Sequence, residues 1–428
     1  MNKKIIAGVV IVALIMTAFF WPKKITIRVG IFSGSNWSVP SGDSYHVIDY
    51  AIERFEKANP NVEVEYESGI LKEDYSLWLS NQIIKGEEPD VYMILSEDFN
   101  TLSSLGALKD LGHFIKSDDK FQSDDFYQSA LNSGVYQNTQ YALPYESNPS
   151  LMFVNKTLLK KEGIDIPDND WTLEDFYNIC KQVTKSTQSN EGDNQYGCYA
   201  YDWLDSVYGH GEQLFDDEGK ECYLSQDSVK DSITFVQKLN ELNQGHIITS
   251  TEFDKGKVAF SPMPFSQYRT YMPYPWRVKK YSQFEWDCVK MPSLPNKEKS
   301  SEVSSLLMGV SSRSYHADTA WEFLKTLTYD QEIQQELFKY SQGISPLKTV
   351  TQSAETLALL KEESGNSQVN MSLLNEVMES AVSHGQFKKY ESALNLINTR
   401  IQEIILKNDD FDISLMQLQR EINQFLKE

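Results

Sequence analysis

Residues 45–68, YHVIDYAIERFEKANPNVEVEYES, carry a helix pattern followed at once by a strand pattern. Four apolar side chains fall at the spacing that places them on one helical face: Ile48, Ala51, Ile52 and Phe55. The pair Asn59-Pro60 ends this helix. Residues 61–68 then alternate polar and apolar side chains, as a half-buried strand does. The stretch therefore predicts a helix and a strand joined by a short turn.

The residues on either side extend this pattern. Residues 23–32 alternate charged and apolar side chains and predict a first strand. Residues 75–89 predict a second amphipathic helix, and residues 90–96 form an apolar run suited to a buried parallel strand. The order strand–helix–strand–helix–strand predicts an α/β fold with a parallel sheet covered by helices. Because 428 residues are too many for one hydrophobic core, two domains are expected.

Helical periodicity returns in five later stretches, namely residues 171–185, 225–245, 316–343, 387–406 and 413–428. Thr172 is expected to cap the first of these helices, with Asp175 three residues further on. Residues 141–155 are strand-like and contain two prolines, which suits a crossing between two halves of the molecule.

The composition limits the classes of partner. Apolar residues make up 40% of the chain and charged residues 24%, which is ordinary for a folded soluble protein. The formal net charge of −21 repels phosphate backbones. We therefore expect no nucleic acid partner.

The N-terminal segment, residues 1–24, has a basic start and an uncharged run from Ile5 to Trp21. It is similar to a signal sequence, but a small-x-small cleavage site is missing. The run is at the short limit for a membrane span. We favour an uncleaved membrane anchor over a cleaved signal. We also expect export of the rest of the chain, because no later segment is hydrophobic enough to span a membrane.

Signature motifs for catalysis, metal binding and cofactor binding are missing from the sequence. It holds no GxSxG, P-loop, GxGxxG or HExxH motif, and no Cys/His cluster with zinc spacing. We predict no catalytic residue, no metal and no cofactor. The four cysteines read as small buried side chains, although an exported protein permits a disulfide between Cys180 and Cys198 or between Cys198 and Cys222.

An aromatic segment stands out in the second half of the chain. Residues 261–276, SPMPFSQYRTYMPYPW, hold five aromatic side chains and four prolines. The prolines exclude a long helix and a central strand. Rings at this density are buried, stacked on a ligand, or left as an exposed apolar surface.

Seven stretches in chain order carry a resemblance to a known family: residues 51–66, 89–111, 141–159, 171–185, 210–220, 253–268 and 320–337. PDVYMILSEDFNTLSSLGALKDL (89–111) and YALPYESNPSLMFVNKTLL (141–159) are two of them. Together they resemble the extracytoplasmic solute-binding proteins of bacterial ABC importers, in the carbohydrate branch that includes the maltodextrin-binding proteins. This family usually carries a lipid-attachment cysteine after its signal, and that cysteine is absent here.

The resemblance implies a two-lobe periplasmic-binding-protein-like fold, α/β in each lobe, with a hinge and a ligand cleft between the lobes. Lobe 1 is expected to hold residues 25–145 and about 307–345, and lobe 2 residues 146–306 and about 346–428. The resemblance also implies an extracytoplasmic monomer that binds a sugar or oligosaccharide. It delivers this ligand to ABC permease subunits in the membrane and performs no catalysis.

Thirteen side chains are candidates for ligand contact, because they match cleft positions of the family or combine flat rings with polar groups. They are Trp37, Ser96, Glu97, Asp98, Glu146, Asn148, Asp202, Trp203, Phe265, Tyr268, Arg269, Trp276 and Tyr390. A flat ring can cover the C–H face of a sugar while carboxylates and amides bind its hydroxyls. For each residue, core packing, a solvated surface or a salt bridge remains the alternative.

Two other functions stay open. A membrane-tethered ectodomain that senses sugars would use the same fold, and the missing lipid-attachment cysteine gives it some support. A secreted carbohydrate-active enzyme has no specific motif behind it, since carboxylate pairs are common in a chain this acidic.

Overall fold

The computed structural model describes residues 24–40, 45–185, 194–271, 283–297, 301–364, 367, 369–407 and 410–428. The predicted anchor, apart from Lys24, and the candidate Trp276 lie outside the described residues.

One large mixed sheet runs through the molecule. Its strands are β1 (Ile25–Gly30), β2 (Val62–Tyr66), β3 (Val91–Ile94), β6 (Ala142–Asn155), β7 (Tyr196–Cys198), β8 (Val258–Pro264), β9 (Trp286–Val289) and β10 (Val303–Val310). The strand order is β2-β1-β3-β10-β6-β8-β7, and β9 also pairs with β6. A separate short ladder joins β4 (Val135–Tyr136) to β5 (Thr139–Gln140).

The helices vary from one turn to five. They are α2 (His46–Ala58), α3 (Lys72–Lys85), α4 (Ser96–Ser104), α5 (Gly112–Ser117), α6 (Gln128–Asn132), α7 (Lys156–Lys161), α8 (Leu173–Val183), α9 (Trp203–Gly209), α10 (Asp227–Glu241), α11 (Ser250–Asp254), α12 (Phe265–Tyr271), α13 (Ala317–Thr328), α14 (Gln331–Tyr340), α15 (Lys348–Thr351), α16 (Ala354–Ser364), α17 (Met371–Ser380), α18 (Tyr390–Lys407) and α19 (Phe411–Lys427).

The predicted strand–helix–strand–helix–strand unit is confirmed as β1-α2-β2-α3-β3. Strand β1 pairs in parallel with β2 and with β3. The buried face of α2 contains Ile48, Ala51 and Phe55, as the 3.6-residue period requires. Asn59 follows α2 as its C-cap. All four residues of β3 are buried, which matches the apolar run in the sequence.

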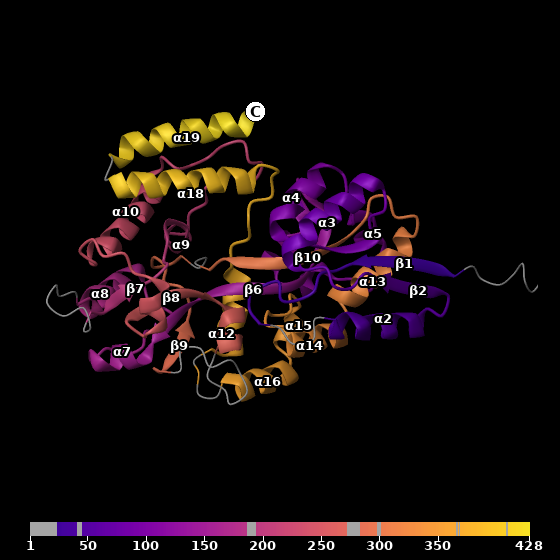
Figure 1. Ribbon diagram of the computed structural model, residues 1–428, viewed down its shortest axis with the longest axis horizontal. Helices are drawn as coiled ribbons and strands as arrows, with labels where there is room; N and C mark the ends of the chain where they lie inside the picture. The colour runs from indigo at the N-terminus through magenta and orange to yellow at the C-terminus, as the bar shows by residue number, and fades with distance from the viewer. Residues whose placement is uncertain are drawn as a thin grey trace, which may run out of the picture.

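The molecule has two lobes, each a sheet segment covered by helices on both faces (Figure 1). The core of lobe 1 draws on side chains from Ile27 to Tyr145 and from Leu306 to Val350. Lobe 2 has three smaller cores, around α12 and α17, around α9, α18 and α19, and around α7 and α8. In Figure 1, lobe 1 lies on the right and lobe 2 on the left.

Strand β6 belongs to both lobes. It pairs antiparallel with β10 from Ala142 to Pro149, and with β8 from Ser150 to Val154. The change of neighbour therefore falls between Pro149 and Ser150. The predicted crossing at residues 141–155 is thus one continuous strand of 14 residues.

The prolines of the aromatic segment lie where the sheet tolerates them. Pro262 and Pro264 pair with β6 on one side of β8, whereas β7 covers the other side of β8 only as far as Phe260. A proline at an open strand edge removes no ladder hydrogen bond there. The next residues form α12, which is described from Phe265 to Tyr271, where this described range ends.

The predicted cap of α8 is also confirmed. Thr172 caps α8, and its side chain and that of Asp175 form a reciprocal capping box. The stretch 316–343 forms two helices, α13 and α14, and the second begins at Asp330, whose carboxylate accepts from the backbone N–H groups of Glu332 and Ile333.

A link between α17 and α18, here called the 381–387 segment, passes over the start of β10. Val303 N donates to Val382 O at 2.9 Å, and Val382 N donates to Ser301 O at 2.8 Å. The segment then contacts lobe 1, because Asn100 Nδ2 of α4 donates to Gly385 O at 2.9 Å. Residues from both lobes therefore meet at this segment.

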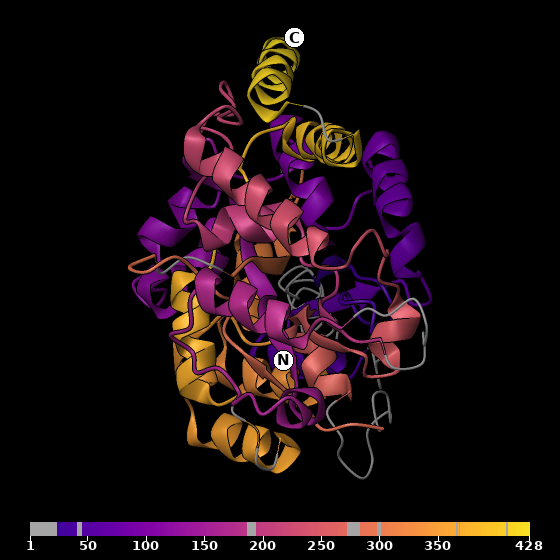
Figure 2. The same ribbon diagram turned by 90° about the vertical axis from the view of Figure 1, so that its left-hand side faces the viewer.

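The C-terminal helices α18 and α19 form a hairpin at one end of lobe 2. Figure 2 shows α19 outermost, with α18 beneath it. Each helix buries one apolar stripe, including Ile397 and Ile401 of α18 and Leu415 and Ile422 of α19. Within the part of the chain that the structure describes, no helix combines the length and apolar character needed to cross a membrane.

Candidate functional site

The candidate site begins at the carboxyl end of β3, where α4 starts. Leu95 is extended and buried, and Ser96 is the first residue of the helix. Ser96 Oγ donates to Ser305 O of β10 at 3.2 Å. In open α/β sheets ligands bind beyond the carboxyl ends of strands, so this is an expected position for a site.

A small cavity lies between α4, β10 and the 381–387 segment. Its polar lining comes from Ser96, Asn100, Ser133, Ser304, Ser305, His384 and Gln386. Asn100 is only 6% exposed, yet its Oδ1 has no hydrogen-bond partner among the described residues, and neither has Gln386 Oε1. The cavity volume of about 20 Å³ holds little more than one water. Buried acceptors without partners are uncommon in proteins and indicate bound water or ligand.

The imidazole of His384 connects this cavity to a group of carboxylates. His384 Nε2 pairs with Glu302, which precedes β10, and His384 Nδ1 lies 3.5 Å from Glu391 Oε1 of α18. Burial alone would lower the pKa of His384, but the hydrogen bonds and charges of the two glutamates outweigh it and raise this pKa to about 10. His384 is therefore a cation at neutral pH.

Two aspartates at the start of α9 lie near the same group. Asp202 is the N-cap of α9, and Asp202 and Asp205 form a reciprocal capping box. Burial is the main cause that raises the pKa of both carboxyls, and the charge of Glu302 adds to it. Asp202 is nevertheless solvent-exposed.

Two tyrosines form the wall behind these carboxylates. Tyr390, the first residue of α18, is 5% exposed, and its ring centroid lies 5.6 Å from that of His384. Burial raises the pKa of Tyr390, with a further contribution from Glu302. Tyr208 of α9 is equally well buried, and burial and the neighbouring Tyr390 raise its pKa. Both phenols are therefore neutral.

A second polar cluster lies on β6 where the lobes join. Glu146 is 4% exposed and accepts from Ser341 Oγ, and from Gly343 N at 2.7 Å. Burial raises the pKa of Glu146, opposed by these donors and by Trp37. The Trp37 indole N–H lies near this carboxyl, but it has no partner at hydrogen-bond geometry among the residues that the structure describes. Trp37 itself is half-buried against the lobe 1 core.

A comparison with known proteins assigns the fold and the family. The family model of bacterial extracellular solute-binding proteins matches residues 40–332, which is more than half of the chain. The chain belongs to this family.

Solved structures of solute-binding proteins match almost the whole chain. The sugar-binding protein MalE from Xanthomonas citri matches with a TM-score of 0.74 at 14% sequence identity, covering 94% of this chain and 97% of that one. The cyclic α-maltosyl-1,6-maltose binding protein from Arthrobacter globiformis has a TM-score of 0.74 at 15% identity, covering 95% and 99%. The substrate-binding protein Lmo0181 from Listeria monocytogenes, solved with cycloalternan, has a TM-score of 0.71 at 18% identity, covering 94% and 99%. These similarities confirm the two-lobe fold.

Three of the aromatic candidates lie in the cores of this solute-binding protein. Phe265 and Tyr268 are 0% and 1% exposed, and Tyr268 OH donates to Ser367 Oγ at 2.7 Å. Trp203 is 3% exposed, and its Nε1 donates to Asn398 Oδ1 of α18 at 3.0 Å. None of the three has a ring face free for a ligand in this structure. Packing, the alternative left open from sequence, accounts for them.

Two polar candidates have structural partners instead of a free polar edge. Asn148 Oδ1 accepts from Ser266 N at 2.9 Å, and Asn148 Nδ2 donates to Ser266 Oγ at 3.0 Å. These two hydrogen bonds fix the start of α12. Arg269 is 2% exposed, and its Nη1 donates to Phe338 O and Ser341 O at 2.8 and 2.9 Å. The expected surface salt bridge or ligand contact of Arg269 is thus replaced by a buried link from α12 to the end of α14.

The three candidates that follow β3 differ in where their side chains lie. Ser96 lines the cavity. Glu97 is exposed on α4, whereas Asp98 turns toward α3 and accepts from Ser76 Oγ at 2.5 Å. Burial raises the pKa of Asp98. Of these three candidates, the structure brings only Ser96 into the cavity between the lobes.

Asn100, Glu302, His384 and Gln386 were missed from the sequence. Asn100 is one turn beyond Ser96 on α4, and a helix starting at Ser96 would have placed both on one face. The other three depend on the path of the 381–387 segment, which brings residues some 80 positions apart into contact. Sequence alone carries no signal for that path.

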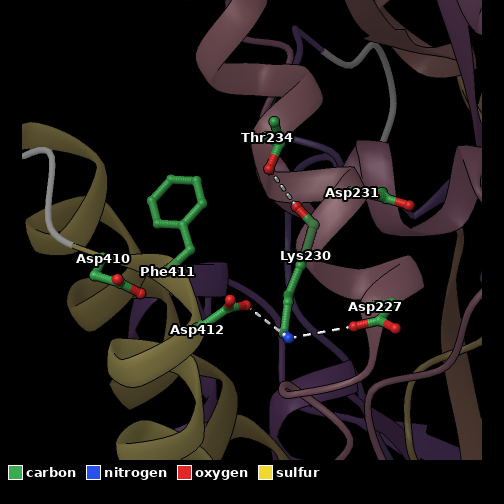
Figure 3. Close-up of a pocket in the computed structure, with 7 residues that line it drawn as sticks. All are labelled: Asp227, Lys230, Asp231, Thr234, Asp410, Phe411 and Asp412. Carbon is green, nitrogen blue, oxygen red and sulfur yellow. Dashed lines mark hydrogen bonds and ion pairs between the residues drawn. The ribbon is translucent and has the colours of Figure 1, made fainter.

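A groove elsewhere on the surface has a different character. It lies between α10 and the start of α19, with a cavity volume of about 350 Å³. Lys230 spans it and pairs with Asp412 at 2.7 Å and Asp227 at 3.2 Å (Figure 3). These polar groups satisfy one another, and the groove is part of the contact between α10 and the C-terminal hairpin rather than between the lobes.

All four cysteines are free thiols. Cys180 and Cys198 belong to the core beneath α8, whereas Cys222 packs in the core beneath α18 and α19, away from Cys198. The disulfides permitted by the sequence are therefore not formed in this structure. Within the described ranges, no group of three or more His, Cys, Asp or Glu side chains is arranged to hold a metal ion.

Proposed function

We propose that this solute-binding protein captures a sugar or oligosaccharide between its two lobes and delivers it to the membrane permease of an ABC importer. The observation that carries the proposal is a pair of acceptors, Asn100 Oδ1 and Gln386 Oε1, that have no partner in the described part of the chain and lie in a cavity lined by both lobes. Sugar hydroxyls are donors that satisfy such acceptors. The structural neighbours from Xanthomonas citri and Arthrobacter globiformis are named as binders of sugars.

Binding requires the lobes to separate first, because the cavity is too small for a sugar ring. The contact from Asn100 to Gly385 breaks as α4 moves away from the 381–387 segment. A ligand then replaces this contact with its own hydroxyls. The lobes proposed from the sequence, residues 25–145 with about 307–345 and residues 146–306 with about 346–428, are the bodies that move.

Five of the original candidates stay in the proposed site. Ser96 lines the cavity, Asp202 and Tyr390 adjoin its carboxylate group, and Trp37 with Glu146 forms the second cluster on β6. Trp37 is the half-buried ring among them and is suited to cover a C–H face once the lobes part. The neutral phenol of Tyr390 can donate to a sugar oxygen.

We also propose that the N-terminal segment tethers the protein to the outer face of the cell membrane and that the protein acts as a monomer without catalytic activity. The uncharged run and the absence of a small-x-small site support the tether. Membrane fractionation and the mass of the mature protein test it, because cleavage removes the segment and releases the protein.

A thermal-shift screen of neutral and charged oligosaccharides tests the binding function. A true ligand at 100 times its Kd stabilises the folded state by about 2.7 kcal/mol, and the ligand is recovered intact. Release of reducing ends would instead identify an enzyme. Co-purification with a sensor kinase in place of a permease would identify a tethered sensor.

The matched variants are Asn100→Ala and Asn395→Ala. Asn100 lines the cavity, whereas Asn395 is exposed on α18. Loss of Asn100 should weaken binding of the sugar found in the screen about tenfold, as expected for one or two hydrogen bonds. Asn395→Ala should leave the affinity unchanged. Equal affinities for the two variants would remove the cavity from the site.

A further inference from the structure

Four carboxylates from three separate parts of lobe 2 gather beside the cavity. They are Asp202, Asp205, Glu302 and Glu391. One cation, His384, faces them, and no lysine or arginine among the described residues forms an ion pair with any of the four. Burial raises the pKa of Asp202 and Asp205, but Glu302 and Glu391 alone outnumber the one cation His384, so the group has an excess of negative charge at neutral pH.

The capping box of α9 uses only one carboxylate oxygen of each aspartate. Asp202 uses Oδ1 to accept from Leu204 N at 2.8 Å and Asp205 N at 3.0 Å, and Asp205 uses Oδ2 to accept from Asp202 N at 3.1 Å. The capping box thus leaves Asp202 Oδ2 and Asp205 Oδ1 without partners in the described part of the chain. A structural cap needs only one oxygen from each residue.

A second observation points to a ligand in the adjoining cavity, which His384 connects to the carboxylates. Asn100 is 6% exposed, and its Oδ1 lines the cavity that His384 also lines, with no hydrogen-bond partner among the described residues. This orphan acceptor comes from lobe 1, whereas the carboxylates come from lobe 2. A ligand held between the lobes therefore meets acceptors from both lobes. Donor groups on the ligand would satisfy them.

We propose that the preferred ligand is an amino sugar with a protonated amine, held by Asp202, Asp205 and Glu391 on lobe 2 and by Asn100 on lobe 1. The inference rests on the proposed sugar-binding function and names its substrate class. An ammonium group supplies three donors and a positive charge, which match the free carboxylate oxygens. A uronate or sugar phosphate meets repulsion from the same group, and this repulsion excludes it.

The test compares three trisaccharides on the full-length protein by isothermal titration calorimetry. The free-amine glucosamine trisaccharide is compared with its N-acetylated form, which has the same backbone without the charge, and with trigalacturonate. We expect the free-amine form to bind about tenfold more tightly than the acetylated form, as a charge-assisted contact provides. Trigalacturonate should not bind. Added salt should reduce the preference, because it screens exposed charges.

The matched variants remove charge and preserve shape. Asp202→Asn keeps a good N-cap residue on α9, and Glu391→Gln keeps the side-chain length. Together they should reduce the preference for the free amine to about twofold, with little change in affinity for the acetylated sugar. Glu241→Gln, on the exposed end of α10, changes the net charge by one unit and should leave the preference intact.

The outcomes separate this inference from the function on which it rests. Equal or tighter binding of the acetylated trisaccharide, binding of trigalacturonate, or binding of maltotriose with no binding of the amine would overturn the amino-sugar preference while sugar binding stands. If no neutral or charged oligosaccharide in the thermal-shift screen binds, the proposed function fails as well.

Discussion

Glu302 and His384 form an ion pair between the residue that precedes β10 and the segment that leads to α18. Their side chains are 29% and 26% exposed, so each is largely screened from water. The pair ties the 381–387 segment to the large sheet at the point where the two lobes meet. It therefore has a role in stability as well as in the electrostatics of the candidate site.

Replacing His384 by Gln should destabilise the protein by roughly 1 to 2 kcal/mol at pH 6. The folded pKa of His384 is raised to about 10, so its contribution is complete below its ordinary pKa of 6.5 and disappears as the pH rises through about 10. The pKa of Glu302 is lowered, although burial opposes this, so the contribution of Glu302 is lost only as the pH falls below its ordinary value of 4.5.

Denaturant unfolding of His384→Gln and wild type at pH 6 and pH 10.5 measures this effect. The difference between the two proteins should shrink at the higher pH. His113→Gln, at an exposed position on α5, is the control and should leave the free energy of unfolding unchanged at both pH values. A difference that stays constant over this range would show that the pair is not formed.

Glu146 should matter as an acceptor more than as a charge. Glu146→Ala leaves Gly343 N and Ser341 Oγ without their acceptor and should cost about 2 to 3 kcal/mol. Glu146→Gln keeps an acceptor oxygen and should lie within about 1 kcal/mol of wild type. Equilibrium unfolding of both variants checks the order, and a larger loss in the Gln variant would contradict it.

The pH dependence of Glu146 has the opposite sign to that of Glu302. Burial raises its folded pKa, so the folded protein binds a proton more readily than the unfolded chain. Wild-type stability should therefore fall, relative to Glu146→Gln, as the pH rises from about 4.5 through the raised pKa. Unfolding at pH 4.5 and pH 7.5 gives the comparison.

Trp203 should contribute to stability and not to sugar binding. Trp203→Phe loses the hydrogen bond to Asn398 Oδ1 and should cost about 1 to 2 kcal/mol, whereas Trp203→Ala should cost about 3 to 5 kcal/mol. The Kd of Trp203→Phe for sugar should stay within about twofold of wild type. A double-mutant cycle with Asn398→Ala isolates the hydrogen bond, and additive effects would argue against it.

The cysteines should titrate as four thiols in the unfolded protein. In the folded protein Cys198 should react first, because it is the one that is not fully buried, and burial raises the pKa of Cys180, Cys222 and Cys288. Thiol counting with and without denaturant tests this. A count of two under denaturing, non-reducing conditions would show a disulfide.

The regular elements were readable from sequence because their signals are local. The helix at Ile48–Phe55, the strand after Asn59-Pro60 and the cap at Thr172 each depend on residues within one or two turns. The strand order was not readable in this way. That β6 pairs with β10 and β8 depends on contacts between residues more than 100 positions apart, and only the resemblance to a family supplied the two-lobe arrangement.

The site was harder to predict than the fold, because the burial of each side chain determines whether it can contact a ligand. Phe265 and Tyr268 have the side chains that a sugar cleft uses, yet they fill a core. A ring that packs and a ring that binds look alike in a sequence. Ser96 was found because it follows a buried strand, which is a local rule, whereas His384 and Gln386 reach the cavity through a long link without regular structure.

The continuity of β6 sets how far a small backbone change is transmitted. Eight residues of β6 lie on the lobe 1 side of the Pro149–Ser150 junction and six on the lobe 2 side, or roughly 20 to 26 Å of extended chain in each lobe. A bend of about 10° at this junction therefore displaces the far end of either arm by about 4 Å, without a change in the strand partners of either arm. A small change of backbone angle at the junction of the lobes is therefore amplified into a larger movement at the outer ends of β6.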